Sequence, residues 1–290
     1  ALYFSGLRQR GLYGIDYSLK GNMTVADFMH RERLVVDKER DIIQRNLDRH
    51  AVQVYWGDGS LKDAHTVHVQ GREGDDIDLE TDVILIATGS SPYHPPEVPF
   101  DGRLIFDSDS ILRMQSIPET MAVIGGGVIG SEYASVFAAL GVQVALIESH
   151  ERILSFVDAE IVERLMKSLD LLGVRFIFND KIVKTAKHDH HVNLTLQSGE
   201  VVVVDSVLFA SGRRGNVNGL GLEALGIELN QRGLLVVNEK YQTNLPTVYA
   251  AGDVIGFPSL ASVSMEQARI AMVHAFDLHY KEHMSPVLPL

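Results

Sequence analysis

The chain has 290 residues, of which 46% are hydrophobic and 22% are charged, and its formal net charge is −12 at pH 7. Such a composition is that of a globular protein with room for about two domains. An acidic chain without a basic run argues against nucleic acid or an anionic membrane surface as a partner. No run approaches the roughly 20 consecutive apolar residues of a membrane-spanning helix, and no charged-then-apolar leader opens the chain, so we expect a cytoplasmic protein.

The 290 residues contain no cysteine, which excludes disulfides, thiolate metal sites and thiol nucleophiles from this stretch. Cysteines outside these residues are not excluded. The chain begins with Ala1 and ends in SPVLPL, so we expect further residues on both sides of it in the whole protein.

The first third of the chain combines a helix with a small β-structure. Residues 24–50 have the apolar spacing of a half-exposed helix, with Thr24 in position to cap it. Residues 52–80 alternate short β-like runs with glycine- and aspartate-rich turns, which predicts an antiparallel meander. The meander leads into DVILIATGSSP (82–92), whose apolar run ending at Thr88 and Gly89 predicts a buried strand.

From residue 121 the pattern changes to alternating strands and helices. The strand MAVI is followed by a glycine loop, a helix over about 128–140 and a strand over 142–148. A second helix is predicted over about 158–172, and the strand VRFIF follows it. Hairpin-like runs at 191–204, a strand starting at 206, an apolar strand before Asp253 and a final helix over 259–280 complete the chain.

The glycine loop AVIGGGVIGSE (122–132) carries a dinucleotide-binding fingerprint. Gly125 permits the tight turn, Gly127 lets the backbone approach a pyrophosphate, and Gly130 lets the helix pack close to the strand. The helix N-terminus offers N–H groups and a partial positive charge to the phosphates. An acid, Glu148, ends the next strand about 20 residues on, as the fingerprint requires. The alternative, a glycine turn without a ligand, fits this context poorly.

Three charged residues near this loop bear on nucleotide choice. Glu148 can accept hydrogen bonds from both ribose hydroxyls of NAD(H) and should repel a 2′-phosphate, so by itself it favours NAD(H), unless it is only a solvated loop acid. Arg152 either reaches a 2′-phosphate or pairs with a neighbouring acid at the surface. Glu132, in the first turn of the helix, is either an acid favoured by the helix dipole or a carboxylate facing the nicotinamide.

Two further stretches suggest a second ligand, LIATGSSP (85–92) and TNLPTVYAAGDVIG (243–256). The second is an apolar strand that ends in Gly252 and Asp253 and is followed by a helix. A carboxylate at the carboxyl end of a strand suits the binding of a polyol chain, because open α/β sheets bind ligands at that edge. The alternative is that Asp253 caps the helix.

Four motifs resemble, in this order and spacing, the two-dinucleotide-binding flavoprotein oxidoreductases that include lipoamide dehydrogenase and glutathione reductase. They are ATG at 87–89, GxGxxGxE at 125–132, SGRRGN at 211–216 and TNLPTVYAAGD at 243–253. The phrases SSPYHPPEVPF, FDSDSIL and GDVIGFPSLAS together look like the soluble pyridine nucleotide transhydrogenases, within the FAD/NAD(P)-dependent pyridine nucleotide-disulfide oxidoreductase family. The resemblance is strong over about 83–271 and weak over the first 80 residues.

The resemblance implies an α/β fold of two interleaved Rossmann-like dinucleotide-binding domains, in which an NAD(P) domain interrupts an incomplete FAD domain. It implies a later part of the FAD-binding domain at 1–117, the inserted NAD(P)-binding domain at 118–242, the return segment of the FAD domain at 243–280, and the start of a linker to a C-terminal dimerisation domain at 281–290. The first strand and glycine loop of the FAD domain, and the redox-active cysteine segment of the family, would lie upstream.

The activity that the resemblance implies is hydride transfer between NADPH and NAD⁺ through FAD, of the Si-specific type, with the 290 residues inactive alone. NAD(H) and NADP(H) would be the substrates, and a homo-oligomer would form through the C-terminal domain. Thr88, Gly89, Gly252 and Asp253 would contact FAD, Glu132 would approach the nicotinamide amide, and Gly212 would line the nicotinamide pocket. No catalytic side chain is expected. The alternatives are a dihydrolipoyl dehydrogenase-like disulfide reductase and a non-catalytic NAD(H)-binding module.

Two polar clusters suggest no site. HDHH (188–191) places adjacent histidines on opposite faces of a strand with no ligand partner at metal-site spacing, so a hairpin tip is expected and no metal. The run from Asp107 to Ser110 predicts a helix N-cap.

Overall fold

The computed structural model describes residues 25–71, 74–281 and 283–284. The chain divides into two compact units, which are described separately here: unit 1 comprises residues up to 46 and 92–212, and unit 2 comprises 47–91 and 213–290. The two units alternate along the chain, because each is built from two segments, and they change over at 46/47, 91/92 and 212/213. The sequence predicts domain boundaries at 117/118 and 242/243, so the compact units group residues 25–46 and 92–117 with the glycine-loop segment and not with 47–91.

Unit 1 is centred on a five-stranded sheet in which all neighbouring strands are parallel. In spatial order its strands are β6 (Ile105–Asp107), β13 (Ser206–Phe209), β7 (Thr120–Ile124), β8 (Gln143–Ile147) and β9 (Arg175–Ile177). Strand β6 pairs with β13 across about 100 residues of sequence, and this pairing holds the segment that follows residue 92 in unit 1.

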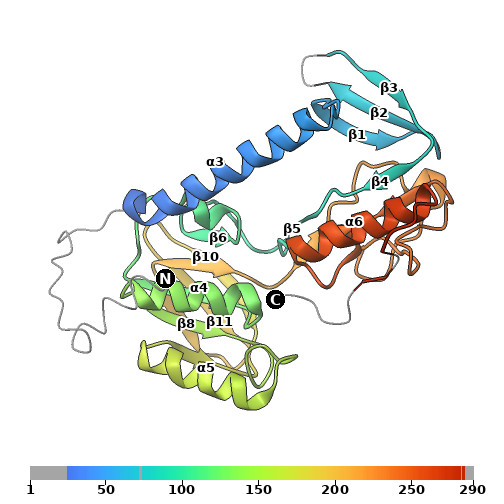
Figure 1. Cartoon of the computed structure of the whole chain (residues 1–290). Coiled ribbons are helices and arrows are strands. Elements are labelled where there is room, and N and C mark those ends of the chain that lie inside the picture. The colour runs from blue at the N-terminus through green and yellow to red at the C-terminus, as the bar shows by residue number, and fades with distance from the viewer. Residues whose placement is uncertain (1–24, 72–73, 282, 285–290) are drawn as a thin grey trace, which may run out of the picture. The chain divides into compact units, whose positions relative to one another are not determined.

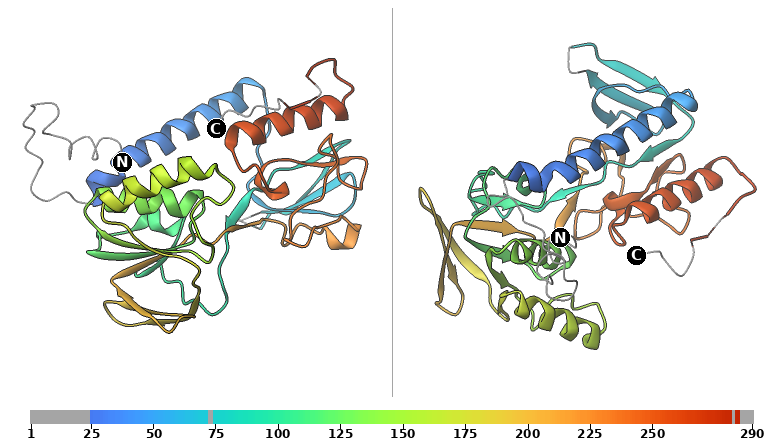
Figure 2. Two further views of the ribbon diagram at one scale, coloured as in Figure 1. Left: turned by 90° about the horizontal axis from the view of Figure 1, so that it is seen from below. Right: turned by 60° about the vertical axis from the view of Figure 1, so that its left-hand side comes forward.

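The two faces of this sheet are covered differently (Figures 1 and 2). Helices α4 (Val128–Ala139) and α5 (Ala159–Leu171) pack on one face, and the antiparallel meander β10 (Ile182–Lys187), β11 (Val192–Leu196) and β12 (Val201–Val204) covers the other. Alternation along β7 directs Met121 and Val123 to the helices and Ala122 to the meander. The predicted β7–α4–β8 unit, the second helix and the 191–204 hairpin are confirmed.

Unit 2 contains three small sheets and one long helix. The predicted meander is present as β1 (Gly57–Leu61), β2 (Thr66–Gly71) and β3 (Ile77–Glu80). Strand β4 (Ile84–Ile86) pairs in parallel with β15 (Val248–Ala250), and β5 (Ser90–Pro92) pairs with β14 (Arg213–Gly215). The core lies around β4 and β15, where Ile84, Ile86, Val248 and Ala250 are buried with Val254 of the 3₁₀ helix η3 (Gly252–Ile255).

The helices agree with the sequence except near the end of the chain. Helix α3 (Val25–Arg49) matches the predicted 24–50. Helix α6 (Ala261–Ala275) is shorter than the predicted 259–280, because Phe276 is its C-cap residue and Asp277 follows with a positive φ of 48°. Two further 3₁₀ turns, η1 (Ser110–Arg113) and η2 (Glu223–Leu225), also lie in the described part of the chain. None of the described helices is both long and apolar enough to cross a membrane.

Candidate nucleotide-binding sites

The glycine loop connects β7 to α4 with the geometry that its spacing predicts. Gly125 has a φ of +102°, and a Cβ there would lie 2.6 Å from the carbonyl oxygen of Ala210. A Cβ on Gly130 would lie 1.8 Å from the carbonyl oxygen of Gly125, so this helix approaches the loop more closely than any side chain allows. A Cβ on Gly127 would meet nothing within 4 Å. The backbone at Gly127 therefore faces open space in which a ligand can lie.

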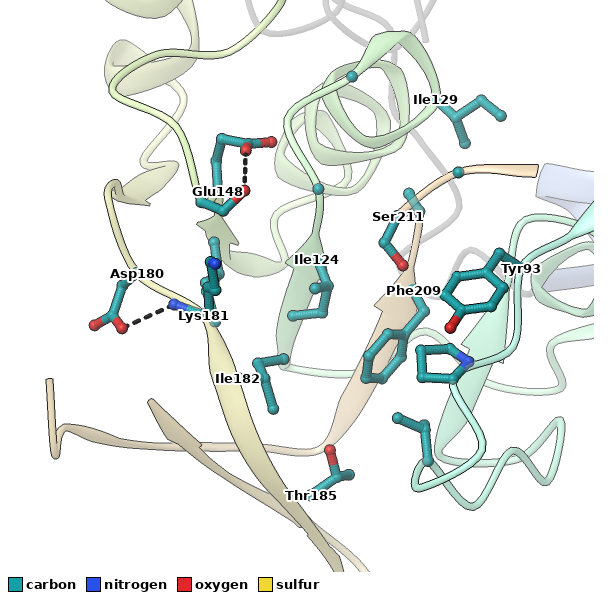
Figure 3. Close-up of a pocket in the computed structure, with 18 of the residues that line it drawn as sticks. Tyr93, Ile124, Ile129, Glu148, Asp180, Lys181, Ile182, Thr185, Phe209 and Ser211 are labelled. Atoms are coloured by element: carbon teal, nitrogen blue, oxygen red, sulfur yellow. Dashed lines mark hydrogen bonds between the residues drawn. The ribbon is translucent and has the colours of Figure 1, made fainter. Parts of the chain in front are cut away.

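That space is a cleft of about 610 Å³ within unit 1, at the carboxyl ends of the parallel strands (Figure 3). Its floor includes the last residues of β7, β8 and β13, namely Ile124, Ile147 and Phe209. Residues 181–185 of the β10 region form one side, and Tyr93, Pro95, Glu97 and Val98 contribute to the other. An extended cleft with apolar walls and a few polar groups is suited to a dinucleotide.

The N-terminus of α4 borders this cleft. Gly127 is the N-cap residue and provides no side-chain cap, and the next two residues, Val128 and Ile129, line the cleft. The first N–H groups of a helix have no partner within the helix. These groups and the positive end of the helix dipole therefore make this edge of the cleft suited to a pyrophosphate.

Glu148 is held firmly at the end of β8, where only 9% of the residue is exposed. One carboxylate oxygen, Oε2, accepts the Gly126 N–H at 2.5 Å. The other, Oε1, accepts the His150 N–H at 2.9 Å, the His150 Nδ1 at 2.6 Å and the Ser149 hydroxyl at 3.0 Å. Burial acts to raise the pKa of Glu148, but the hydrogen bonds from Gly126, His150 and Ser149 outweigh it, so the pKa is lowered. The carboxylate is thus ionised, and it fastens the glycine loop to the end of the next strand.

The side chain that contacts Glu148 is not Arg152, which the sequence offered as one possible partner. Arg152 donates from Nη2 to the Ser155 carbonyl oxygen at 2.9 Å and does not line the cleft. His150 does line the cleft, and its side chain is 70% exposed while it contacts Glu148. Sequence reasoning missed His150 because a histidine two residues past a strand carries no spacing signal.

Gly212 is part of the cleft lining, whereas Glu132 is not. Glu132 lies in the second turn of α4, not in the first turn as expected, because the helix begins at Val128. Its side chain is exposed and is not part of the cleft lining. Gly212 lines the cleft with a φ of +119°, and its carbonyl oxygen accepts the Tyr93 N–H at 3.0 Å. The roles of both residues toward nicotinamide stay predictions.

The four residues predicted to contact FAD lie together in unit 2, because β4 and β15 are parallel neighbours that end at the same edge. The Ala251 N–H donates to the Ile86 carbonyl oxygen at 3.0 Å just beyond the paired residues. Thr88 and Gly89 follow β4, and Gly252 and Asp253 follow β15. The adjacency of ATG and GD, which are 163 residues apart, is therefore a consequence of parallel pairing.

Asn216 of the SGRRGN motif holds the Thr88–Gly89 turn. Its side-chain amide donates to the Thr88 carbonyl oxygen at 2.9 Å, and its N–H donates to the Gly89 carbonyl oxygen at 2.9 Å. The Thr88 hydroxyl donates to the Asn216 carbonyl oxygen at 2.7 Å. On the other strand, Gly252 has a φ of +80° and donates its N–H to the amide oxygen of Gln267, which is 3% exposed.

The sequence left helix capping by Asp253 as an alternative, and the structure does not have this cap. It lies inside η3, whose N-cap residue is Ala251, and its carboxylate instead accepts the Ser90 hydroxyl at 2.8 Å. The helix N-cap predicted in the run from Asp107 to Ser110 is present, but the side chain that caps the helix is not that of the N-cap residue. Asp107 Oδ1 accepts the N–H groups of Asp109 and Ser110 at the start of η1, while the N-cap residue Asp109 makes no side-chain cap.

The histidine run at 188–191 forms the tip of the β10–β11 hairpin, as expected, with His188 and His191 stacked at 4.5 Å between ring centroids. Among the described residues, no group of three potential ligand side chains could hold a metal ion.

Comparison with known proteins agrees with this geometry. The family model described as pyridine nucleotide-disulphide oxidoreductase matches residues 14–272. A soluble pyridine nucleotide transhydrogenase of Mycobacterium bovis is 41% identical over 276 residues, which cover 95% of this chain and 59% of the relative. A protein of the same name from Yersinia pestis is 43% identical over 246 residues, which cover 85% of this chain and 53% of the relative. The chain thus spans between half and three fifths of the length of these relatives.

Solved structures show the same architecture. The crystal structure of LpdA from Mycobacterium tuberculosis superposes with a TM-score of 0.89 at 30% identity and covers 99% of this chain and 62% of that one. The HOCl-induced flavoprotein disulfide reductase RclA from Escherichia coli superposes with a TM-score of 0.79 at 27% identity, over 87% of this chain and 57% of that one. The fold is therefore the Rossmann-like α/β type predicted from the sequence, and the chain belongs to the pyridine nucleotide-disulphide oxidoreductase family.

Proposed function

We propose that the whole protein transfers hydride between NADPH and NAD⁺ through bound FAD, as a soluble pyridine nucleotide transhydrogenase. The observation that carries this proposal is the identity of 41–43% with relatives of that name across 85–95% of the chain. The cleft of unit 1, with its glycine loop and buried acid, supplies a nucleotide site that such a reaction requires.

The unit 1 cleft fits a nicotinamide dinucleotide. Gly125 and Gly127 with the α4 N-terminus would hold the pyrophosphate, and Gly130 would keep the helix close. Glu148 would accept an adenosine ribose hydroxyl on Oε2, where the Gly126 N–H leaves acceptor capacity, while Oε1 already contacts three donors. Gly212 would line the nicotinamide end, and Glu132 would approach the nicotinamide amide after a movement of its exposed side chain.

The edge of β4 and β15 in unit 2 fits part of FAD. Thr88 and Gly89 would lie along the cofactor, and Gly252 and Asp253 would contact its ribityl and phosphate part. The fit rests on Asp253, which is half-buried and whose Oδ1 accepts no hydrogen bond within the described residues, so that it can take a ligand hydroxyl. When bound, FAD supplies the ring that accepts hydride from one nicotinamide and returns it to another. The chain's own residues bind and orient the nucleotides, and we assign none of them to acid–base catalysis.

The decisive experiment uses the whole protein loaded with FAD. NADPH is mixed with thio-NAD⁺ and the formation of thio-NADH is followed, while a parallel cuvette contains dihydrolipoamide and NAD⁺. We expect fast thio-NADH formation and no dihydrolipoamide oxidation. The reverse result would make the protein a disulfide oxidoreductase, the activity named for RclA, and binding of nucleotide without any turnover would indicate a sensing module.

Finer features of the proposal follow from the same relatives. We propose Si-specific transfer, which stereospecifically deuterated NADPH tests, and a homo-oligomer, which sedimentation of the whole protein tests. Because the chain spans only 53–59% of the relatives' length, we expect the 290 residues alone to be inactive. We also propose a cytoplasmic protein, and the net charge of −12 argues against nucleic acid and an anionic membrane surface as partners.

A further inference from the structure

A hydrogen-bonded chain of three side chains in unit 2 ends at the carboxylate of Asp253. The Ser90 hydroxyl donates to Asp253 Oδ2 at 2.8 Å. The same hydroxyl accepts a hydrogen bond from Arg213 Nε, also at 2.8 Å. Arg213 is aligned by a second contact, from Nη2 to the Ser90 carbonyl oxygen at 2.8 Å. Ser90 therefore lies between a guanidinium group and a carboxylate and is bonded to both.

The arrangement follows from the pairing of two short strands. Ser90 begins β5 and Arg213 begins β14, and these strands are neighbours in a two-stranded sheet. Asp253 is at the edge where β15 ends, and a β4–β15 pair places that edge beside the residues that follow β4. Three residues that are far apart in the sequence are thus brought together by backbone pairing, and no local pattern marks Ser90 as a partner of Asp253.

We propose that Ser90 and Arg213 are positioning residues that orient Asp253 for the binding of FAD. This inference rests on the proposed role of Asp253 toward FAD and adds the residues through which that role is achieved. A hydroxyl that accepts from a guanidinium is a stronger donor, because neighbouring hydrogen bonds polarise one another and charged partners strengthen them. Ser90 thereby fixes Oδ2 and leaves Oδ1 for a hydroxyl of the ligand.

Fixing the carboxylate in advance should matter for affinity. A carboxylate that already has its binding rotamer loses less side-chain freedom when the ligand arrives. Without Ser90, Asp253 would rotate among solvent-facing conformations and would have to be ordered by FAD itself. Without Arg213, the Ser90 hydroxyl would lose the donor that directs its proton to Asp253.

The test is the affinity of the whole apoprotein for FAD, measured by the quenching of FAD fluorescence on titration. We expect Ser90→Ala to raise the Kd for FAD about tenfold, which is the size of effect that ordering one additional side chain on binding produces. Ser90→Thr retains the hydroxyl and should restore the affinity to within about twofold. The matched control is Ser91→Ala, which removes a neighbouring hydroxyl that bonds to Asn216 Oδ1 at 2.7 Å and not to Asp253. It should leave the Kd within about twofold.

A second pair of variants tests the charged end of the chain. Arg213→Gln should weaken FAD binding several-fold, whereas Arg214→Gln, which removes the same charge one residue away, should not. Thermal unfolding of each apoprotein shows whether it is folded.

The outcomes separate this inference from the proposed function. If Asp253→Asn weakens FAD binding and Ser90→Ala does not, the positioning role is wrong while the role of Asp253 stands. Failure of Ser90→Thr to restore affinity, or an equal effect of Ser91→Ala, also overturns the positioning role. If Asp253→Asn itself leaves the Kd for FAD unchanged, the proposed contact between Asp253 and FAD is wrong.

Discussion

Replacement of Glu148 by glutamine tests both functions that the structure gives to this side chain. The carboxylate accepts a backbone N–H on each oxygen, Gly126 on Oε2 and His150 on Oε1. An amide has one oxygen and one NH₂ group, so one of these two N–H groups would face another donor. We therefore expect Glu148→Gln to lower the free energy of unfolding by about 1.5–3 kcal/mol, the cost of losing a hydrogen bond to a charged group.

The same variant should change nucleotide preference. NAD(H) would lose part of its ribose acceptor, whereas NADP(H) would be relieved of a negative charge beside its 2′-phosphate. Two unit charges about 4 Å apart near a protein surface repel by up to about 4 kcal/mol before screening, so a tenfold change, about 1.4 kcal/mol, is a conservative expectation. The ratio of the Kd for NADPH to the Kd for NADH should fall at least about tenfold.

The assay is calorimetric titration of the whole protein with each nucleotide, together with urea unfolding. The matched control is Glu151→Gln, which removes the same charge from an exposed side chain nearby. An unaltered ratio of the two Kd values in Glu148→Gln, or an equal change in Glu151→Gln, would refute the selectivity argument. An unaltered unfolding free energy would refute the structural one.

The pH dependence gives a further check on Glu148. Its pKa is lowered from the ordinary 4.5 in the folded protein, so the unfolded state binds more protons in acid. The stability that it contributes is fully present above the ordinary value and is lost as the pH falls through the lower, folded value. The difference in stability between wild type and Glu148→Gln should therefore be constant near neutral pH and shrink below about pH 4.5.

Three other predictions concern unit 1. Gly130→Ala should destabilise the protein by about 1–3 kcal/mol and weaken NADH binding, because its Cβ would overlap the Gly125 carbonyl oxygen. A variant with the melting temperature and the NADH affinity of the wild type would contradict the close approach of helix and loop. Asp101→Ala should cost about 1–3 kcal/mol in urea unfolding. Burial acts to raise the pKa of Asp101, but hydrogen bonds from three backbone N–H groups and Lys187 hold it far below 3.8. The stability that Asp101 contributes should therefore be lost only in strong acid. If Asp101→Ala lowered the unfolding free energy equally at neutral pH and in strong acid, this prediction would be wrong. Tyr133→Phe should cost about 1 kcal/mol, because its hydroxyl donates to a carbonyl oxygen at 3.2 Å. Burial, with the charge of Glu132, raises the pKa of Tyr133 to about 12, so absorbance titration should show no tyrosinate from this residue below pH 11.

Local patterns were enough to predict the β7–α4–β8 unit and the conformation of its glycine loop. The glycine spacing and the strand and helix periods are set within about 25 residues, over which backbone conformation follows directly from residue type. The structure agrees with the tight turn at Gly125, the close packing at Gly130 and the terminal position of Glu148. The interruption of one dinucleotide-binding domain by another, which the family resemblance implies, stays a prediction; in the structure the two compact units alternate along the chain.

Tertiary structure alone decided which side chains complete each site. The partnership of Ser90 with Asp253 joins residues 163 apart, and β10 reaches the cleft only because its meander covers one face of the sheet. The pairing of β6 with β13, which holds the segment after residue 92 in unit 1, is likewise a contact between distant segments. Periodicity records which face of an element is buried, but it does not record which distant element covers that face. Which distant element covers a face depends on the packing of the whole chain. The hydrogen-bond partners of His150, Arg213 and Asn216 depend on the same packing.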